Sequence, residues 1–282
     1  MRWKGRRQSD NVVDQRGQRR SVSSKRGASG GALVLLIIAG LFFGEDAKNI
    51  LSLFIGDETY TQNSNYQTSQ NANDEAASFV RVILAETEDT WDAVFAKLGQ
   101  RYPRPELVMY TGQVNSACGV GSAASGPFYC PGDRKIYIDL SFLSQLKQMG
   151  APGDFAFAYV IAHEVGHHVQ NITGIANIVR QQQSRVSKVE SNGLSVQLEL
   201  QADCLAGVWI NHTERRNAIL EQGDLEEGFA AAAAVGDDRL MRQAGHAPRR
   251  EAFTHGSSKE RVQWFKQGMR YGNIEKCNTF SL

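Results

Sequence analysis

Residues 154–173 carry the feature that most constrains how this chain folds. They have helical periodicity, with a Pro-Gly-Asp start signal at one end and Gly174 as a stop at the other. Side chains four residues apart on a helix lie on one face, so His163 and His167 project side by side. Two imidazole nitrogens in this arrangement can hold one Zn²⁺ ion. Glu164 lies one residue further round the same turn.

Glu164 is placed to take a proton from a metal-bound water without becoming a metal ligand itself. A catalytic zinc site has three protein ligands and one open position, so a third ligand must come from elsewhere in the chain. The metzincin pattern would need Gly at position 170 and His at position 173. This chain has Gln170 and Thr173, which excludes that class.

The third ligand is expected in a second helical pattern at residues 195–209. Its carboxylates Glu199 and Asp203 are again four residues apart and share one face. Glu199 can complete a His₂Glu site, and Asp203 can accept the second ring N–H of a ligand histidine and fix its tautomer. The alternative is a solvated acidic face that caps the helix or pairs with arginine.

These motifs resemble those of known peptidases. H-E-x-x-H followed by E-x-x-A-D resembles the gluzincin pattern of thermolysin-like and CAAX-prenyl-type peptidases. The wider set is similar to the bacterial putative neutral zinc metallopeptidase family, over essentially the whole chain. It comprises the Cys-Gly…Gly-Pro-Phe-Tyr-Cys-Pro stretch at 118–132, His163-Glu-Val-Gly-His-His, Glu199-Leu-Gln-Ala-Asp-Cys, Gly236-Asp-Asp-Arg-Leu and Thr254-His-Gly-Ser-Ser.

The resemblance implies a zinc peptidase fold with one Zn²⁺ ion as cofactor. By that resemblance His163, His167 and Glu199 are the zinc ligands, and Glu164 is the catalytic base. We therefore expect an α+β, zincin-like domain with an active-site helix, a second ligand-bearing helix and a small sheet, preceded by a single transmembrane helix.

Two segments predict the small sheet. Lys135–Asp139 alternates between polar and apolar residues, and the short apolar run Leu107–Tyr110 can pair with it. In peptidases of this general type an edge strand beside the zinc helix binds substrate backbone by strand addition. The alternative is that both segments are ordinary sheet strands, because a sequence does not show which strand lies at an edge.

His255 lies in a Thr-His-Gly-Ser turn just before an amphipathic helix. In the CAAX-type peptidases a histidine in a similar turn approaches the zinc, so we interpret His255 as a hydrogen-bond donor to the oxyanion of the tetrahedral intermediate. The alternative is that it caps the helix or lies on the surface. His168 is about 140° round the helix from His163 and is expected to be a packed or exposed histidine.

The net charge of +1 hides two unlike regions. Residues 1–30 hold nine basic and two acidic side chains, a balance of +7, so the remaining residues sum to −6. The basic stretch has few large apolar residues and ends in a Ser/Gly-rich run, which predicts a disordered tail. An uncharged apolar run follows at residues 31–44, and a second run reaches residue 55.

We interpret residues 31–55 as a transmembrane anchor. The basic cluster before it places residues 1–30 in the cytoplasm and the rest of the chain outside, as the positive-inside rule requires. The alternatives are a buried core helix or a cleaved signal peptide. Residues 56–72 are rich in Asn, Gln, Ser and Thr and predict a polar linker, so the catalytic domain is expected at residues 73–282.

The four cysteines agree with an oxidising compartment. Cys118 and Cys130 are close in the sequence, and their pairing leaves Cys204 and Cys277 as the second pair. Four cysteines permit three connectivities, and the spacing does not select among them. The alternative is four free buried thiols in a cytosolic domain.

Together these patterns predict a membrane-anchored, extracytoplasmic zinc endopeptidase of the bacterial inner membrane, with peptides or proteins as substrates. Such an enzyme is expected to hydrolyse peptide bonds with a zinc-bound water that Glu164 activates. The competing interpretation is a non-catalytic, zinc-stabilised module that binds peptides or envelope proteins. A nucleic-acid partner is not expected, because the basic tail adjoins an apolar segment and thus serves as an orientation signal. The sequence does not specify an oligomeric state.

Overall fold

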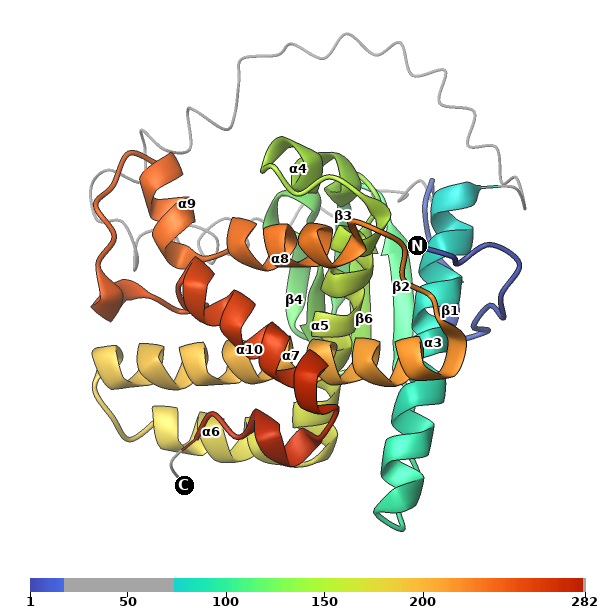
Figure 1. The fold of residues 1–282 in the computed structure, drawn as a ribbon. Helices are drawn as coiled ribbons and strands as arrows, with labels where there is room; N and C mark the ends of the chain where they lie inside the picture. Colours follow the sequence, from blue (N-terminus) through green and yellow to red (C-terminus); the bar gives the residue numbers. More distant parts are fainter. Residues whose placement is uncertain (18–73, 281–282) are drawn as a thin grey trace, which may run out of the picture. The chain divides into compact units, whose positions relative to one another are not determined.

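Residues 1–17 and 74–280 are described by a computed structural model, in which they belong to one compact unit (Figure 1). The fold mixes helices and small sheets, as the sequence predicts. The elements in chain order are β1 (Val12–Asp14), α3 (Glu75–Lys97), β2 (Glu106–Tyr110), β3 (Gln113–Ser116), β4 (Gly119–Ser122), η2 (Ala123–Ser125), β5 (Phe128–Cys130), β6 (Lys135–Asp139), α4 (Phe142–Gln148), α5 (Asp154–Ile172), α6 (Ile175–Gln183), α7 (Lys188–Asn217), α8 (Asp224–Ala234), α9 (Asp237–Gln243), η3 (Arg250–Ala252), α10 (Ser258–Tyr271) and η4 (Ile274–Cys277).

The larger sheet has the strand order β1-β2-β6-β5. Strands β1, β2 and β6 are parallel, and β5 runs antiparallel to β6. Leu107 pairs with Ile136, so the predicted pairing of the two segments is confirmed. Both β2 and β6 are interior strands, and the edge beside β6 is formed by the three-residue strand β5. Strands β3 and β4 form a separate antiparallel hairpin.

Alternation along β2 and β6 divides the apolar side chains between two clusters. Leu107 and Met109, with their neighbours on β6, belong to the main core that the helices cover. Val108 and Tyr110 belong to a smaller cluster on the other side, together with Val114 of the hairpin. Both faces of these two strands are therefore covered.

Helix α5 lies at the centre of the unit. It begins at Asp154 and ends at Ile172, and Gly174 follows with a φ of +84°, as the predicted start and stop signals require. It contacts α3, α7 and α8, and also β5 and β6 of the sheet. Surrounded in this way, α5 is buried over most of its length, which explains why it is apolar on nearly every side.

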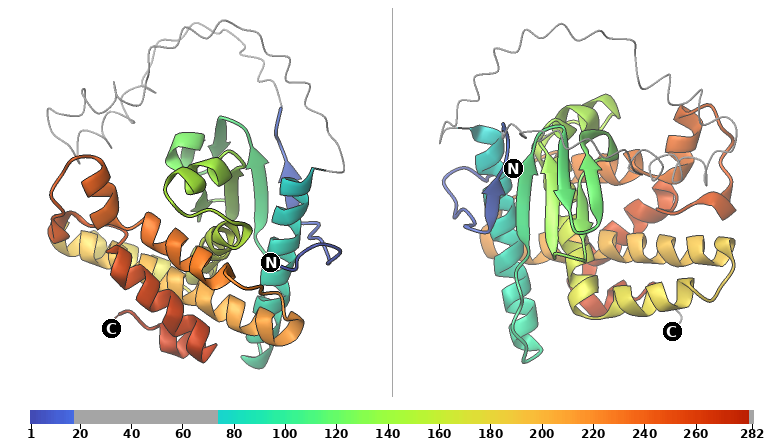
Figure 2. Two further views of the ribbon diagram at one scale, coloured as in Figure 1. Left: turned by 45° about the horizontal axis from the view of Figure 1, so that its top comes forward. Right: turned by 180° about the vertical axis from the view of Figure 1, so that it is seen from behind.

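Helix α10 crosses α7 at very close range (Figure 2). A Cβ atom added at Gly268 would lie 1.8 Å from the Cys204 carbonyl oxygen, and one at Gly207 would lie 2.2 Å from that of Phe265. Glycine is thus required at both positions for the two backbones to approach this closely. The approach brings Arg261 of α10 within hydrogen-bond distance of Asp203 on α7.

Residues 1–17 are an integral part of the unit, so the prediction of a disordered tail is wrong for them. Strand β1 pairs with β2 at the edge of the sheet. Trp3 is buried, and its ring packs edge-on against Phe79 of α3 with centroids 5.3 Å apart. Composition predicted disorder because this stretch has few apolar side chains, but those side chains pack against residues far along the chain, such as Phe79.

The charges of this segment also have partners. The Met1 ammonium lies 3.0 Å from Asp154 at the start of α5 and 3.3 Å from Asp224 at the start of α8. Ser9 donates to the buried Glu88 carboxylate at 2.6 Å, and Arg7 pairs with the same carboxylate at 3.0 Å. The Met1 ammonium and the Arg7 guanidinium therefore compensate acidic charges of the folded unit, and the Ser9 hydroxyl gives the Glu88 carboxylate a hydrogen bond.

The predicted anchor (31–55) and linker (56–72) lie outside the described residues. In residues 1–17 and 74–280, no helix combines the length and the apolar character that a membrane crossing needs. Because β1 hydrogen-bonds to β2, residues 1–17 and 74–280 must lie in the same compartment. That requirement disagrees with the expectation that residues 1–30 lie in the cytoplasm and the catalytic domain lies outside it.

Candidate metal centre

The fold brings His163, His167 and Glu199 together. One ligand atom from each lies within 4.8 Å of the others. The Nε2 atom of His163 is 3.2 Å from one Glu199 oxygen, and the Nε2 atom of His167 is 3.3 Å from the other. Two imidazole nitrogens and a carboxylate form a donor set that suits a catalytic zinc ion. These residues therefore fit the metal that the sequence predicts.

Asp203 supports His163 from behind. The Nδ1–H of His163 donates to Asp203 Oδ1 at 2.8 Å, which leaves Nε2 directed at Glu199. The carboxylate is fully buried, and Arg261 donates to both of its oxygens at 2.8 and 2.9 Å. The Tyr159 hydroxyl donates to it as well. The buried charge is thus compensated, and the position of the carboxylate is fixed.

The electrostatics of the cluster favour a cation. Burial favours the neutral form of His163, but Asp203 and Glu199 outweigh it and raise the pKa of His163 to about 10. Burial likewise opposes ionisation of Glu199, and the two histidines nevertheless hold its pKa well below the usual range. A metal ion must displace protons from the histidines, so metal binding is expected to strengthen as pH rises.

Glu164 lies on the same cleft as the three ligands and is largely buried. Among the described residues, no group hydrogen-bonds to its carboxylate or forms an ion pair with it. Its oxygens are therefore available to a molecule that enters the cleft. This is the condition that a general base must meet.

The cleft has a volume of about 690 Å³ and contains the metal-site side chains. Phe128 and Tyr129 of the edge strand β5 line it, and so does Gln145 of α4. The edge strand that borders the metal helix is therefore β5, and the two segments considered for this position are interior strands. Three residues between turns were too short for a strand signal.

His255 lines the same cleft and is half exposed. Its Nδ1 is 3.2 Å from Asp237 Oδ1, and the other oxygen of Asp237 accepts the backbone N–H groups of the turn at 2.6 to 2.9 Å. Burial lowers the pKa of His255, but its hydrogen bond to Asp237 and the charge of Glu199 raise it overall. Ser257, rather than His255, caps α10.

A model of the family described as putative neutral zinc metallopeptidase matches residues 1–280. The chain belongs to this family. It is 49% identical to the "Uncharacterized protein YpfJ" of Escherichia coli K12 over 288 residues, which cover 99% of each chain. It is 40% identical to the "Uncharacterized protein Rv2575" of Mycobacterium tuberculosis over 218 residues, 73% of each chain. No solved structure matches it.

The histidine that follows the second candidate ligand packs in the core. His168 is fully buried; its Nε2–H donates to the Pro103 carbonyl at 2.6 Å, and its Nδ1 accepts from the Tyr129 hydroxyl at 3.1 Å. Burial lowers its pKa to about 4. The prediction that His168 is not a ligand agrees with this packing. His168 instead holds Tyr129, and with it β5, against α5.

Both predicted disulfides are present in this member of the zinc metallopeptidase family. Cys118 pairs with Cys130, and Cys204 pairs with Cys277, so no cysteine is free. The first bond closes the loop region around β3, β4 and β5. The second joins α7 to the C-terminal turn η4.

Several residues of the site were missed by sequence reasoning. Asp237 stands in a stretch that carried the resemblance and Arg261 follows another such stretch by three residues, but nothing in their spacing assigned them a role. Tyr159, Gln170 and Gln201 lie on the two predicted helices and look like ordinary polar positions. Tyr159 is four residues before His163, a spacing that places it on the same face.

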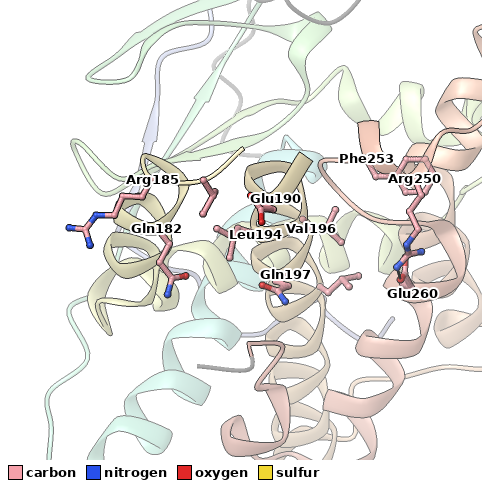
Figure 3. Close-up of a pocket in the computed structure, with 12 residues that line it drawn as sticks. Gln182, Arg185, Glu190, Leu194, Val196, Gln197, Arg250, Phe253 and Glu260 are labelled. Carbon is pink, nitrogen blue, oxygen red and sulfur yellow. Dashed lines mark hydrogen bonds and ion pairs between the residues drawn. The ribbon is translucent and has the colours of Figure 1, made fainter. Parts of the chain in front are cut away.

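A second cavity, of about 780 Å³, contains none of the three candidate ligands (Figure 3). It lies between α6, the start of α7 and the η3–α10 segment. The lining includes Val196 and Leu200 of α7 and the ion pair between Arg250 and Glu260. The larger cavity is therefore separate from the chemical groups described above.

Proposed function

We propose that this protein is a zinc-dependent endopeptidase, with His163, His167 and Glu199 as the ligands. The observation that carries this proposal is the Glu164 carboxylate, which lines the cleft beside the ligand set and has no hydrogen-bond or ion-pair partner within residues 1–17 and 74–280. A purely structural zinc site has four protein ligands and has no use for such a carboxylate. The family to which the chain belongs supports the same chemistry.

The residues divide the work of peptide hydrolysis. Zinc, when bound, supplies positive charge that polarises the scissile carbonyl and lowers the pKa of water. Glu164 accepts a proton from the attacking water and returns it to the leaving amine. His255, held by Asp237, donates a hydrogen bond to the carbonyl oxygen as negative charge develops there.

The cleft supports a peptide or protein as the substrate. Strand β5 lies at the sheet edge and lines the cleft, so an extended peptide can add to it and run past Glu164. The cleft also extends beyond the metal ligands, because its lining includes residues of α4, α6 and α9. We therefore propose cleavage within a chain rather than removal of terminal residues.

We further propose that the folded unit works outside the cytoplasm. Two disulfides and the lack of free cysteines are typical of an oxidising compartment. The pairing of β1 with β2 disagrees with a transmembrane anchor at residues 31–55 that would separate residues 1–17 from residues 74–280, so for this segment we propose only contact with the membrane.

The test compares purified wild type with Glu164→Gln on a broad peptide library, both loaded with zinc. Glu226→Gln, an exposed glutamate of α8, is the matched control. We expect wild type and the control to cleave, and Glu164→Gln to lose activity while it keeps its zinc. Equal behaviour of wild type and Glu164→Gln would refute the peptidase proposal and favour a zinc-stabilised binding module.

The role of His255 has a separate test. Removal of one oxyanion donor typically lowers kcat by about 10²–10³. We expect His255→Ala to fall in this range with zinc content unchanged, and Asp237→Asn to have a smaller effect in the same direction. Loss of zinc in parallel with activity would instead assign His255 a role in holding the metal site together.

A further inference from the structure

His167 is supported differently from His163. Its Nδ1 lies 2.9 Å from Oε1 of Gln170, which is 1% exposed, so its partner is a neutral amide. His163, in contrast, donates to the carboxylate of Asp203. A neutral amide can present either a donor or an acceptor to the ring, so something must fix its orientation.

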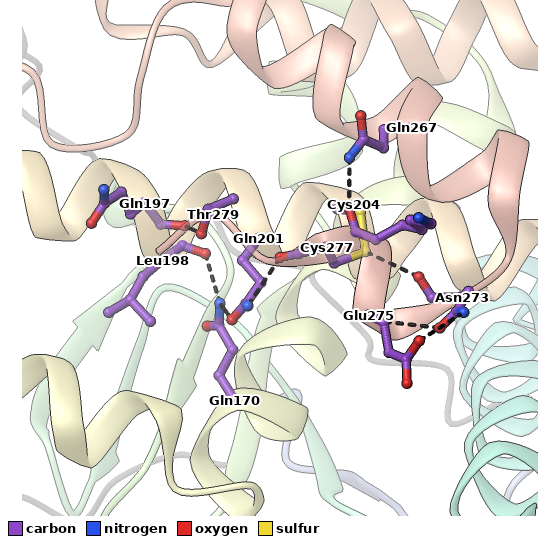
Figure 4. The surroundings of a disulfide bond; sticks show 11 residues. Gln170, Gln197, Leu198, Gln201, Cys204, Gln267, Asn273, Glu275, Cys277 and Thr279 are labelled. Carbon is purple, nitrogen blue, oxygen red and sulfur yellow. Dashed lines mark hydrogen bonds between the residues drawn. A yellow bond between two sulfur atoms is a disulfide. The ribbon is translucent and has the colours of Figure 1, made fainter. Parts of the chain in front are cut away.

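A chain of hydrogen bonds continues from Gln170 to the C-terminal disulfide (Figure 4). The Nε2 group of Gln170 lies 2.7 Å from the Leu198 carbonyl and 3.1 Å from Oε1 of Gln201. The Nε2 group of Gln201 lies 3.0 Å from the Cys277 carbonyl. Cys277 is bonded to Cys204, which follows Gln201 by three residues on α7.

The backbone carbonyls determine the direction of every bond in this chain, because a carbonyl can only accept. The Cys277 carbonyl selects the NH₂ end of Gln201, which turns its oxygen toward Gln170. The Leu198 carbonyl and that oxygen select the NH₂ end of Gln170, which turns Oε1 toward His167. Oε1 must receive a proton, so Nδ1 of His167 carries it and Nε2 keeps its lone pair.

We propose that Gln170 and Gln201 are positioning residues that hold His167 in the metal-binding tautomer, and that the Cys204–Cys277 disulfide anchors the far end of this relay. The inference rests on the metal site of the proposed function. It implies that the C-terminal turn η4 helps to retain the metal, through the side-chain amides of Gln201 and Gln170. Partners that orient a ligand histidine typically contribute about 10–100-fold to metal affinity.

The two ligand histidines should therefore differ in what they depend on. Asp203 is held by Arg261 and Tyr159, so the support of His163 lies within α5, α7 and α10. The support of His167 ends at a turn whose position depends on a covalent bond to α7. Both glutamines are buried, so water does not replace a missing partner easily.

The experiment measures zinc affinity of the full chain by competition with a chromophoric chelator at fixed pH. The variants are Gln170→Leu, Gln201→Leu and the double change Cys204→Ala with Cys277→Ala, which leaves no thiol of this pair to bind zinc. Gln267→Leu is the matched control, because its exposed amide donates to the Lys276 carbonyl of the same turn but has no link to His167. A cooperative thermal unfolding transition, measured with the metal removed by a chelator, identifies the variants that fold.

We expect affinity about 10–100-fold weaker for Gln170→Leu, a smaller loss for Gln201→Leu and the cysteine pair, and none for Gln267→Leu. Folded variants that bind zinc as tightly as wild type would overturn the relay. Wild type that binds no zinc would overturn the proposed function itself.

A second measurement does not depend on whether the variants fold. The ¹⁵N shifts of the His167 ring in zinc-loaded wild type report which nitrogen carries the proton. Protonated Nδ1 agrees with the relay, and unprotonated Nδ1 contradicts it.

Discussion

The metal centre and the N-terminal segment (residues 1–17) are both ordered, but only the first could be predicted. The metal centre is built from two pairs of side chains, each four residues apart on one helix, so its geometry is largely local. The N-terminal segment is ordered by partners that lie far along the chain, such as Phe79 and Asp224. The spacing of side chains within one helix can be recognised in a sequence, whereas the contacts between distant segments cannot.

The difference also concerns how charge is used. A run of basic side chains without apolar neighbours is typical of a solvated tail. Here Arg6 and Arg7 instead pair with Glu86 and Glu88, two glutamates that α3 buries. The acidic partners show no distinguishing pattern, because they stand in an ordinary helical sequence.

The largest effect is expected from loss of a ligand. His163→Ala should weaken zinc binding by more than the roughly 10–100-fold that loss of an orienting partner costs. Stability of the N-terminal segment should not change, because none of its residues contacts His163. Zinc affinity and the unfolding free energy of the metal-free protein check this. Wild-type zinc affinity in the variant would remove His163 from the site.

The second prediction concerns Trp3. Removal of a buried tryptophan typically costs about 3–5 kcal/mol, so Trp3→Ala should lower Tm by roughly 6–20 °C in a domain of this size. Zinc affinity of the folded protein should stay the same. Val13→Ala, on an exposed position of β1, is the control. An unchanged Tm for Trp3→Ala would contradict the packing of residues 1–17 and favour a disordered tail.

The third prediction uses the buried His168. Its pKa of about 4 in the folded protein is below the value of an unfolded histidine, so its neutral form stabilises the fold above pH 6.5. That contribution, about 3 kcal/mol, is lost as pH falls from 6.5 toward 4. Chemical unfolding of metal-free His168→Gln should therefore depend less on pH in this window than wild type. Parallel curves would contradict the assignment.

The smallest effect concerns the Met1 amine of the N-terminal segment and is expected at alkaline pH. Burial lowers the pKa of the Met1 amine, but Glu221 and Asp154 raise it overall to about 10. A raised pKa stabilises the fold below pH 8, and that contribution is lost as pH rises through 10. A chain that starts at Met1 should lose Tm in this window, and Asp224→Asn should lose less. Identical losses would show that the amine is not involved.

Much of the fold core and the metal cluster could be predicted, for a physical reason. Helix α5 combines strong periodicity with start and stop signals, and the pattern at residues 195–209 lies within the longer helix α7. The reactive side chains of both helices follow the helical repeat. The pairing of β2 with β6 follows from one segment that alternates between polar and apolar residues and from a short apolar run. These signals are local and do not require knowledge of distant contacts.

The remaining features depend on tertiary contacts. Strand β5 is three residues long and is defined by its pairing with β6, so it has no sequence signal of its own. Arg261 reaches Asp203 only because Gly268 lets α10 approach α7. Gln170 and Gln201 become informative when the carbonyls around them are known. The direction of a hydrogen bond is a property of the fold rather than of a motif.

The central claim is that two helices, each with a pair of side chains four residues apart, form one catalytic zinc site. Zinc K-edge absorption spectroscopy of the purified protein tests it most directly, together with metal analysis. We predict one zinc ion per chain with two imidazole nitrogens and a carboxylate oxygen as protein ligands, and an altered spectrum for Glu199→Gln. Sulfur ligands, or a purified protein that binds no zinc when supplied with it, would contradict the account.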